Sequence, residues 1–126
     1  MKQLINGLQH IGIPTNDLQK AIDFYQSIGF ETKLLTQTPR EKVAFMELQS
    51  LMLELYENKQ ATEKPGAIDH IALDVNNIQA VYEKIQTLGY RVIEGDIQFL
   101  PFWDHGVRYF TILSPESVKV EFSQKL

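Results

Sequence analysis

Hydrophobic positions along the chain first alternate, as in a strand, and then recur at helical spacing. The same succession of patterns returns sixty residues later. In the stretches 8–14 and 68–75, apolar side chains alternate with others, which is typical of a β-strand with one buried face. Each stretch is followed by apolar residues at helical spacing, which predicts an amphipathic helix. These positions are Leu18, Ala21, Ile22, Tyr25 and Ile28 in the first copy and Ile78, Val81, Tyr82, Ile85 and Leu88 in the second.

Both predicted helices have start and stop signals at matching places. Asn16-Asp17 and Asn76-Asn77 precede the apolar positions and are favourable N-cap residues. Gly29 and Gly89 follow the last apolar positions, where a left-handed C-terminal cap is expected. The chain therefore contains two copies of one supersecondary unit, each with a strand followed by a helix.

Further strands are predicted after each helix, at about 31–36, 43–48 and 51–57 and then at about 90–94, 107–113 and 118–123. The polar segment 58–67 contains Pro-Gly and is interpreted as a linker. The chain thus reads as one α+β domain, 1–126, built from two tandem βαβββ modules, about 4–57 and 68–126. We expect two half-sheets curled into a cupped, partly open barrel-like mixed sheet with the helices on its outer face.

Strand alternation places four polar residues on the face away from the helices. Because successive side chains point to opposite faces, the aliphatic residues of each strand share the helix-covered face. His10 and Glu54 of the first module, and His70 and Glu121 of the second, fall on the other face. Each half contributes one His from its first strand and one Glu from its last. A single strand histidine is commonly only packed, and a single glutamate commonly faces solvent, but the symmetry of the set favours a shared cavity.

Composition limits the chemistry. The 126 residues carry a net charge of −4 without a basic stripe, so nucleic acid is not an expected partner. The absence of cysteine excludes disulfides, thiolate metal sites and a cysteine nucleophile. No apolar run approaches a membrane span and the N-terminal ten residues lack a signal-peptide core, so the expected location is the cytoplasm, without membrane association. Two imidazoles and two carboxylates suit one divalent ion: Zn, Ni, Co, Mn or Fe.

The segments that carry these residues resemble the vicinal oxygen chelate superfamily, which includes glyoxalase I, methylmalonyl-CoA epimerase, extradiol dioxygenases and fosfomycin- and bleomycin-resistance proteins. The similar stretches are "LQHIGIPTNDLQKAIDFYQSIGF", "LMLELYEN", "IDHIALDV" and "SPESVKVEFSQ", in family order. The resemblance implies paired βαβββ modules around a metal held by His10, Glu54, His70 and Glu121. It also implies a homodimer.

Glyoxalase I has this two-His, two-Glu pattern, so the resemblance implies a metal-dependent lyase or isomerase. In such enzymes a chelated carbonyl passes through an enediolate. Glu121 is the first candidate for the base and Glu54 the second. The alternatives are an epimerase, extradiol dioxygenase or fosfomycin-resistance enzyme of the same fold, or a metal-free drug-binding protein of bleomycin-resistance type.

Residues for substrate binding match the family less completely. Pro14 stands where glyoxalase I commonly has an arginine that holds glutathione, whereas Asn58 keeps the expected asparagine, so the thiol co-substrate stays open. Phe99, Phe102 and Trp103 lie in a Pro-containing segment that could wall an apolar pocket or plug the core. His105 is either a second proton-transfer group or an exposed turn residue.

Overall fold

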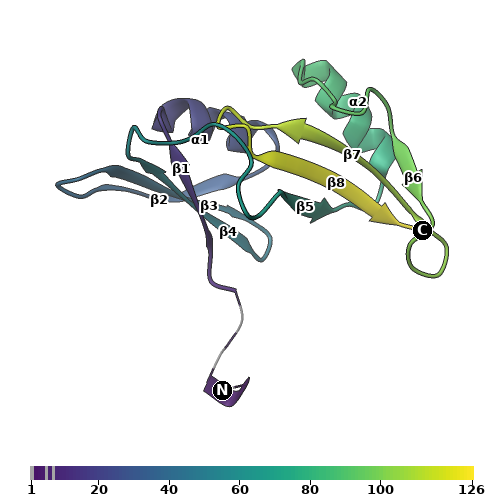
Figure 1. Cartoon of the computed structure of the whole chain (residues 1–126), viewed down its shortest axis with the longest axis horizontal. Helices are drawn as coiled ribbons and strands as arrows, with labels where there is room; N and C mark the ends of the chain where they lie inside the picture. Colours follow the sequence, from purple (N-terminus) through teal and green to yellow (C-terminus); the bar gives the residue numbers. More distant parts are fainter. Residues whose placement is uncertain (1, 5, 7) are drawn as a thin grey trace. The chain divides into compact units, whose positions relative to one another are not determined.

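The chain divides into two compact units, Met1–Thr62 and Glu63–Leu126, in a computed structural model that describes residues 2–4, 6 and 8–126. The division falls inside the polar segment 58–67, which is predicted to be a linker. Each unit holds one α-helix and a four-stranded mixed sheet (Figure 1). The predicted α+β class with two tandem βαβββ modules is therefore confirmed.

The first unit begins with a short 3₁₀ helix, η1 (Lys2–Leu4). Its other elements are β1 (Ile11–Thr15), α1 (Leu18–Ser27), β2 (Glu31–Gln37), β3 (Lys42–Leu48) and β4 (Leu51–Glu57). The strand order is β1-β4-β3-β2, with β1 parallel to β4 and the other pairs antiparallel. Helix α1 packs on β3 and β4. The core residues include Tyr25, Met46, Leu53 and Leu55, which are fully buried.

The second unit repeats this arrangement. Its elements are β5 (His70–Asp74), α2 (Ile78–Leu88), β6 (Gln98–Leu100), β7 (Val107–Leu113) and β8 (Lys119–Lys125). The strand order is β5-β8-β7-β6, with β5 parallel to β8. Helix α2 packs on β7 and β8 over a core that includes Ile78, Phe110, Ile112 and Val120.

Both helices start at the predicted N-caps. The side chain of Asp17 accepts a hydrogen bond from the Lys20 backbone N–H at 3.1 Å, and Asn77 accepts one from Ala80 N–H at 3.0 Å. These contacts satisfy donors that have no partner inside the helix. Helix α2 also ends as expected, at Gly89 with a left-handed φ of +81°.

A second cap reaches each helix from the last strand of its own unit. The Glu57 carboxylate accepts the Leu18 N–H at 3.2 Å, and the Gln124 side-chain oxygen accepts the Ile78 N–H at 2.8 Å. The Leu18 N–H, followed by the Lys59 ammonium, holds the pKa of Glu57 below its usual value. These bonds tie the strand that carries each predicted metal-binding glutamate to the start of the covering helix.

Strand β2 forms an outer edge of the first sheet and contains a bulge. Its pairing with β3 shifts between Thr32 and Leu34, which leaves Lys33 as the extra residue. The Lys33 ammonium lies 3.2 Å from the Glu31 carboxylate and 3.7 Å from that of Glu47. One positive charge and two negative charges, one of them on the neighbouring strand β3, therefore lie together at the bulge.

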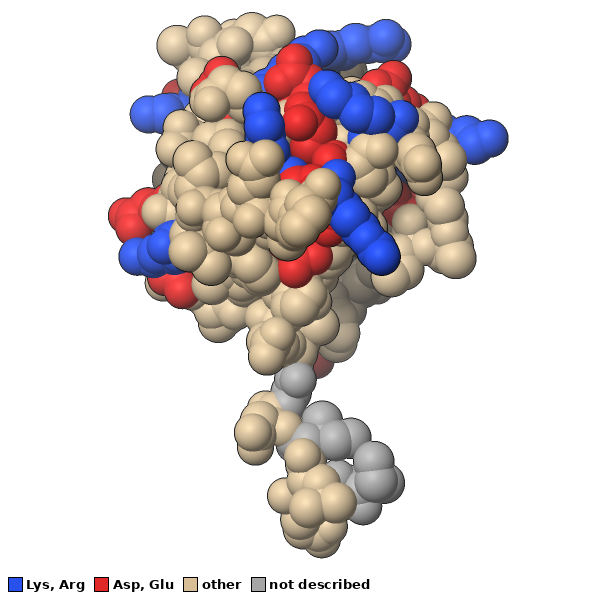
Figure 2. All heavy atoms as spheres, turned by 90° about the vertical axis from the view of Figure 1, so that its left-hand side faces the viewer, with Lys and Arg blue, Asp and Glu red and all other residues tan. Residues whose placement is uncertain are grey.

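One face of the molecule carries charges of both signs. On the face drawn in Figure 2, Lys and Arg side chains lie among Asp and Glu side chains. No helix in the described part of the chain is long and apolar enough to cross a membrane.

The prediction of a strand at 90–94 is wrong. This segment is irregular, and the short strand β6 follows instead. Ile93 N–H still bonds to the Thr111 carbonyl at 2.8 Å, but the Thr111 N–H bonds to the Glu94 carboxylate at 2.9 Å. A side chain thus replaces the main-chain partner, and Gly95, at φ +85°, interrupts the extended backbone before β6.

Two strand starts also differ from expectation. The strands predicted at 8–14 and 68–75 are shorter, because Leu8 and Ile68 are exposed and lie outside the parallel ladders. His10 consequently lies just before β1 rather than within it. The other expected strands agree with the observed ones to within two residues at either end.

Candidate functional site

His10 and Glu54 lie side by side on the first sheet. In the parallel pairing of β1 with β4, Gly12 stands opposite Glu54. His10 comes two residues before Gly12, so its ring points to the same face of the sheet. His10 Nε2 lies 3.9 Å from Glu54 Oε2, and both side chains are partly exposed. A side chain larger than that of Gly12 would begin to fill the space beside the carboxylate.

His70 and Glu121 repeat this geometry on the second sheet. Ala72 stands opposite Glu121 in the parallel pairing of β5 with β8, and His70 again comes two residues earlier. His70 Nε2 lies 3.6 Å from Glu121 Oε2. The His70 side chain is 44% exposed and that of Glu121 is 20% exposed. We refer to the two arrangements as the His10–Glu54 pair and the His70–Glu121 pair.

The other ring nitrogen of each histidine contacts the residue just before it. His10 Nδ1 lies 3.0 Å from Gln9 Oε1, and His70 Nδ1 lies 3.0 Å from Asp69 Oδ2. An oxygen acceptor at this distance favours the tautomer with its proton on Nδ1. Nε2 then keeps its lone pair on the side of the glutamate, which is the orientation a metal ligand requires.

Asp69 is itself held in place. Its Oδ1 accepts a hydrogen bond from Lys119 Nζ at 2.9 Å. Hydrogen bonds from His70 and then from Lys119 lower the pKa of the Asp69 carboxyl, so it stays ionised at neutral pH. Sequence reasoning missed Gln9 and Asp69, although their shared place directly before a predicted ligand was a usable signal.

The donor atoms fit one half of a metal site in each unit. Two donors about 2.1 Å from one ion at the tetrahedral angle are about 3.4 Å apart. The observed separations of 3.9 and 3.6 Å differ from this by a few tenths of an ångström. Across residues 2–4, 6 and 8–126, no group of three or more His, Asp or Glu side chains is placed to hold a metal. The four predicted ligands thus form two pairs, one per unit.

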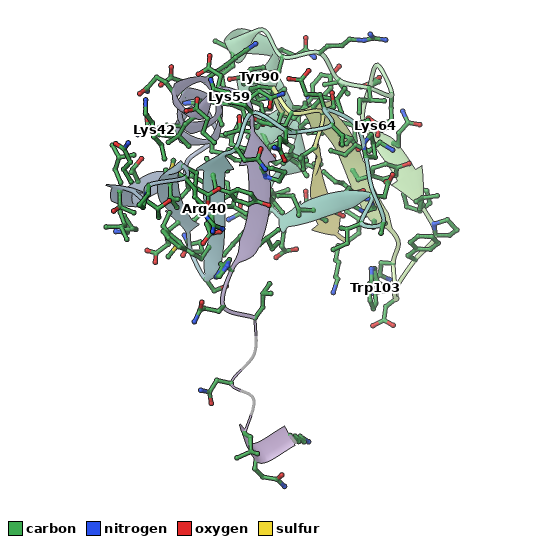
Figure 3. The ribbon with its side chains drawn as sticks, turned by 60° about the vertical axis from the view of Figure 1, so that its left-hand side comes forward. Arg40, Lys42, Lys59, Lys64, Tyr90 and Trp103 are labelled. Carbon is green, nitrogen blue, oxygen red and sulfur yellow. The ribbon has the colours of Figure 1, made fainter. Side chains whose placement is uncertain are left out.

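The His70–Glu121 pair lines a concavity of about 940 Å³ in the second unit. Phe102 and Trp103, two of the predicted substrate residues, also line it, together with Lys125. Trp103 lies at the tip of the loop after β6 (Figure 3) and is 68% exposed. The aromatic loop therefore borders the same space as one half of the predicted metal site.

The other predicted substrate residues lie elsewhere. Phe99 is on β6, and His105 is exposed in the turn before β7; neither is among the described residues that line this concavity. Asn58 follows β4, where its side-chain oxygen accepts the Gln60 N–H at 2.9 Å. This bond gives Asn58 a role in the turn after β4.

Comparison with known proteins supports one family. Residues 7–122 match the Glyoxalase/Bleomycin resistance protein/Dioxygenase superfamily. The uncharacterized protein YwbC of Bacillus subtilis is 30% identical, over 94% of this chain and 97% of that protein. A glyoxalase family protein from Enterococcus faecalis has a similar fold, with a TM-score of 0.81, 20% identity and coverage of 95% of this chain and 98% of that one.

A further similar structure is the fosfomycin resistance protein FosX from Listeria monocytogenes, complexed with Mn(II) and sulfate ion. Its TM-score is 0.73 and its identity 20%, with coverage of 97% of this chain and 94% of that one. At this identity the likeness concerns the fold. The sequence match over most of the length, together with the two βαβββ modules, shows that the chain belongs to the Glyoxalase/Bleomycin resistance protein/Dioxygenase superfamily.

Proposed function

We propose that the protein is a divalent-metal-dependent enzyme of glyoxalase I type, which transfers a proton next to a carbonyl of a small substrate. The observation that carries this proposal is the repeated pair of a histidine, oriented through its Nδ1, and a glutamate 3.6–3.9 Å from its Nε2. The Mn(II) in the similar FosX structure supports a divalent ion. The ion would be held by His10, Glu54, His70 and Glu121.

The residues divide the work by their chemistry. The two imidazoles and two carboxylates hold the ion, which when bound supplies Lewis-acid polarisation of a carbonyl oxygen. The Glu121 carboxylate takes a proton from the carbon next to that carbonyl and returns it to the neighbouring carbon. Glu54 is the second candidate for this step. Phe102 at the border of the concavity helps to exclude water from it.

Metal content is the first test. We expect about one divalent ion per chain in the purified protein, and its loss in His10→Ala and Glu121→Ala, because each change removes a donor. His105→Ala is the matched control, since His105 is the remaining histidine of the chain and lies in an exposed turn. The measurement is the number of metal ions per chain in the three variants and in the native protein.

Failure to bind metal would contradict the proposal. If the native protein takes up no Zn, Ni, Co, Mn or Fe under reducing, anaerobic conditions, the four residues are a polar lining and the protein is a metal-free binder. If metal binds, methylglyoxal with a small thiol tests the glyoxalase reaction, and a catechol tests the dioxygenase alternative. Turnover of the catechol alone would replace the proposed reaction with the second one.

Asp69→Ala is expected to weaken metal binding by about 10–100-fold, the usual effect of losing a partner that orients a ligand. The Asp69→Asn variant separates orientation from charge, because an amide oxygen can still accept the His70 Nδ1–H, as Gln9 does for His10. We expect it to keep most of the affinity. Calorimetric titration with Zn measures the metal affinity of both variants. Native affinity in Asp69→Ala would show that His70 needs no orienting partner.

A further inference from the structure

One face of β8 carries two lysines with different surroundings. Lys119, Glu121 and Lys125 share this face, because even numbers of residues, two and then four, separate them along the strand. Lys119 is neutralised by Asp69 at 2.9 Å. Lys125 has no carboxylate within ion-pair distance among the residues that the structure describes. The concavity therefore has an unneutralised cation at the opposite end of β8 from Lys119.

Lys125 is held by an aromatic ring and not by an acid. Its Nζ lies 4.0 Å from the centre of the Trp103 ring. A ring face attracts an ammonium from one side only, so the remaining N–H donors of Lys125 stay available to a ligand. Trp103 adopts a left-handed φ of +61°, which is costly for a residue other than glycine and typical of functional loops.

The Trp103 loop is anchored to the end of β8. Gly106 closes the loop at φ +92°, and a side chain there would clash with the Phe99 ring. The Gly106 carbonyl accepts the Leu126 N–H at 3.0 Å, directly after Lys125. This hydrogen bond thus brings the loop that carries the Trp103 ring to the end of the strand that carries the Lys125 ammonium.

We propose that the Lys125–Trp103 pair binds an anionic group of the substrate, which makes the substrate an elongated carboxylic acid or phosphate ester. This inference rests on the proposed function, which places the reacting carbonyl, at the other end of the substrate, beside the His70–Glu121 pair. Glu121 and Lys125 are four residues apart on β8, so about 13 Å of strand separates them. The spacer between carbonyl and anion lies against Phe102 and Tyr109, which line the same concavity.

An acidic side chain in the same wall provides an internal comparison. Asp74 on β5 stands opposite Ser123, two residues from Lys125, and also lines the concavity. The negative charge of Asp74 repels a bound anion, whereas the positive charge of Lys125 attracts it. Neutralising Asp74 should therefore strengthen anion binding, and neutralising Lys125 should weaken it.

The test uses metal-free protein, so that it does not depend on the proposed reaction. Trp103 is the sole tryptophan of the chain, and its fluorescence reports on the pair directly. We would titrate the protein with hexanoate, hexyl phosphate and the neutral hexanamide. Saturable changes are expected with one or both anions and not with the amide. A phosphate preference identifies a phosphate ester as the substrate class, and a carboxylate preference identifies an acid.

The variants then decide the assignment. Lys125→Met is expected to weaken anion binding about tenfold or more, the effect of losing a hydrogen bond to a charged group. Lys125→Arg should restore it, Asp74→Asn should strengthen it, and Lys84→Met, on the exposed face of α2, should leave it unchanged. Equal binding of hexanamide, or native anion affinity in Lys125→Met, would overturn the inference. A protein that binds the anions but no metal would overturn only the proposed reaction.

Discussion

Replacing Glu121 with glutamine is expected to reduce turnover by about 10²–10⁴-fold, the usual contribution of a positioned general base. The amide has nearly the shape of the carboxylate, so the second unit should stay folded. It cannot take up a proton, and it is a weaker donor to a divalent ion. Turnover should therefore be measured at saturating metal, on whichever substrate the thiol and catechol assays identify, beside the metal content of the same sample.

Glu54→Gln is the matched control, because Glu54 holds the same place beside His10 that Glu121 holds beside His70. With Glu121 as the base, the Glu54 variant loses metal affinity but keeps most of its turnover once metal saturates. The reverse result would assign the base to Glu54. A fully active Glu121→Gln enzyme would contradict the catalytic role proposed for Glu121.

Phe110→Ala is expected to lower the free energy of unfolding of the second unit by about 3–5 kcal/mol, the usual cost of emptying a buried phenylalanine site. Phe110 on β7 is completely buried. Its ring centre lies 5.3 Å from that of Tyr82 on α2 and 5.1 Å from that of Phe122 on β8. The change removes a contact between the helix and the sheet, and its cost is a large part of the about 5–15 kcal/mol that stabilises a typical protein.

Urea denaturation of Phe110→Ala and Phe102→Ala checks this expectation. Phe102 is more than half exposed, so its truncation should change the free energy of unfolding by about 0.5 kcal/mol or less. Equal losses in the two variants would mean that the aromatic loop contributes as much stability as the core. A native midpoint in Phe110→Ala would mean that α2 does not depend on this ring.

Much of the fold could be predicted, because the periods of apolar residues and the caps agree with each other. Helices α1 and α2 begin directly after their N-caps, Asp17 and Asn77, as expected. The error at 90–94 arose from a side chain. Nothing in the order of residues shows that the Glu94 carboxylate bonds to the Thr111 N–H in place of a strand partner. A side chain that takes the place of a main-chain hydrogen-bond partner depends on contacts between residues that are distant in sequence.

The pairing of His with Glu was predictable, because it depends only on which face of a strand a residue occupies. The orientation of each ring was not, since it depends on the Nδ1 contacts with Gln9 and Asp69. Trp103 was recognised from its residue type and loop. Lys125 was not, because its stacking on Trp103 brings together residues from different elements. Side-chain conformation is thus the main part of the site that sequence reasoning lacks.

The bulge in β2 has a consequence for behaviour at high concentration. Leu34 and Leu35 are exposed on an edge strand, a combination that invites a strand of another molecule to add to the sheet. The unpaired residue at Lys33 interrupts the regular row of N–H and C=O groups that such an addition needs. Its charge, with those of Glu31 and Glu47, would have to be desolvated in the new contact. The irregular edge therefore protects the protein from aggregation while it keeps two leucines at its surface.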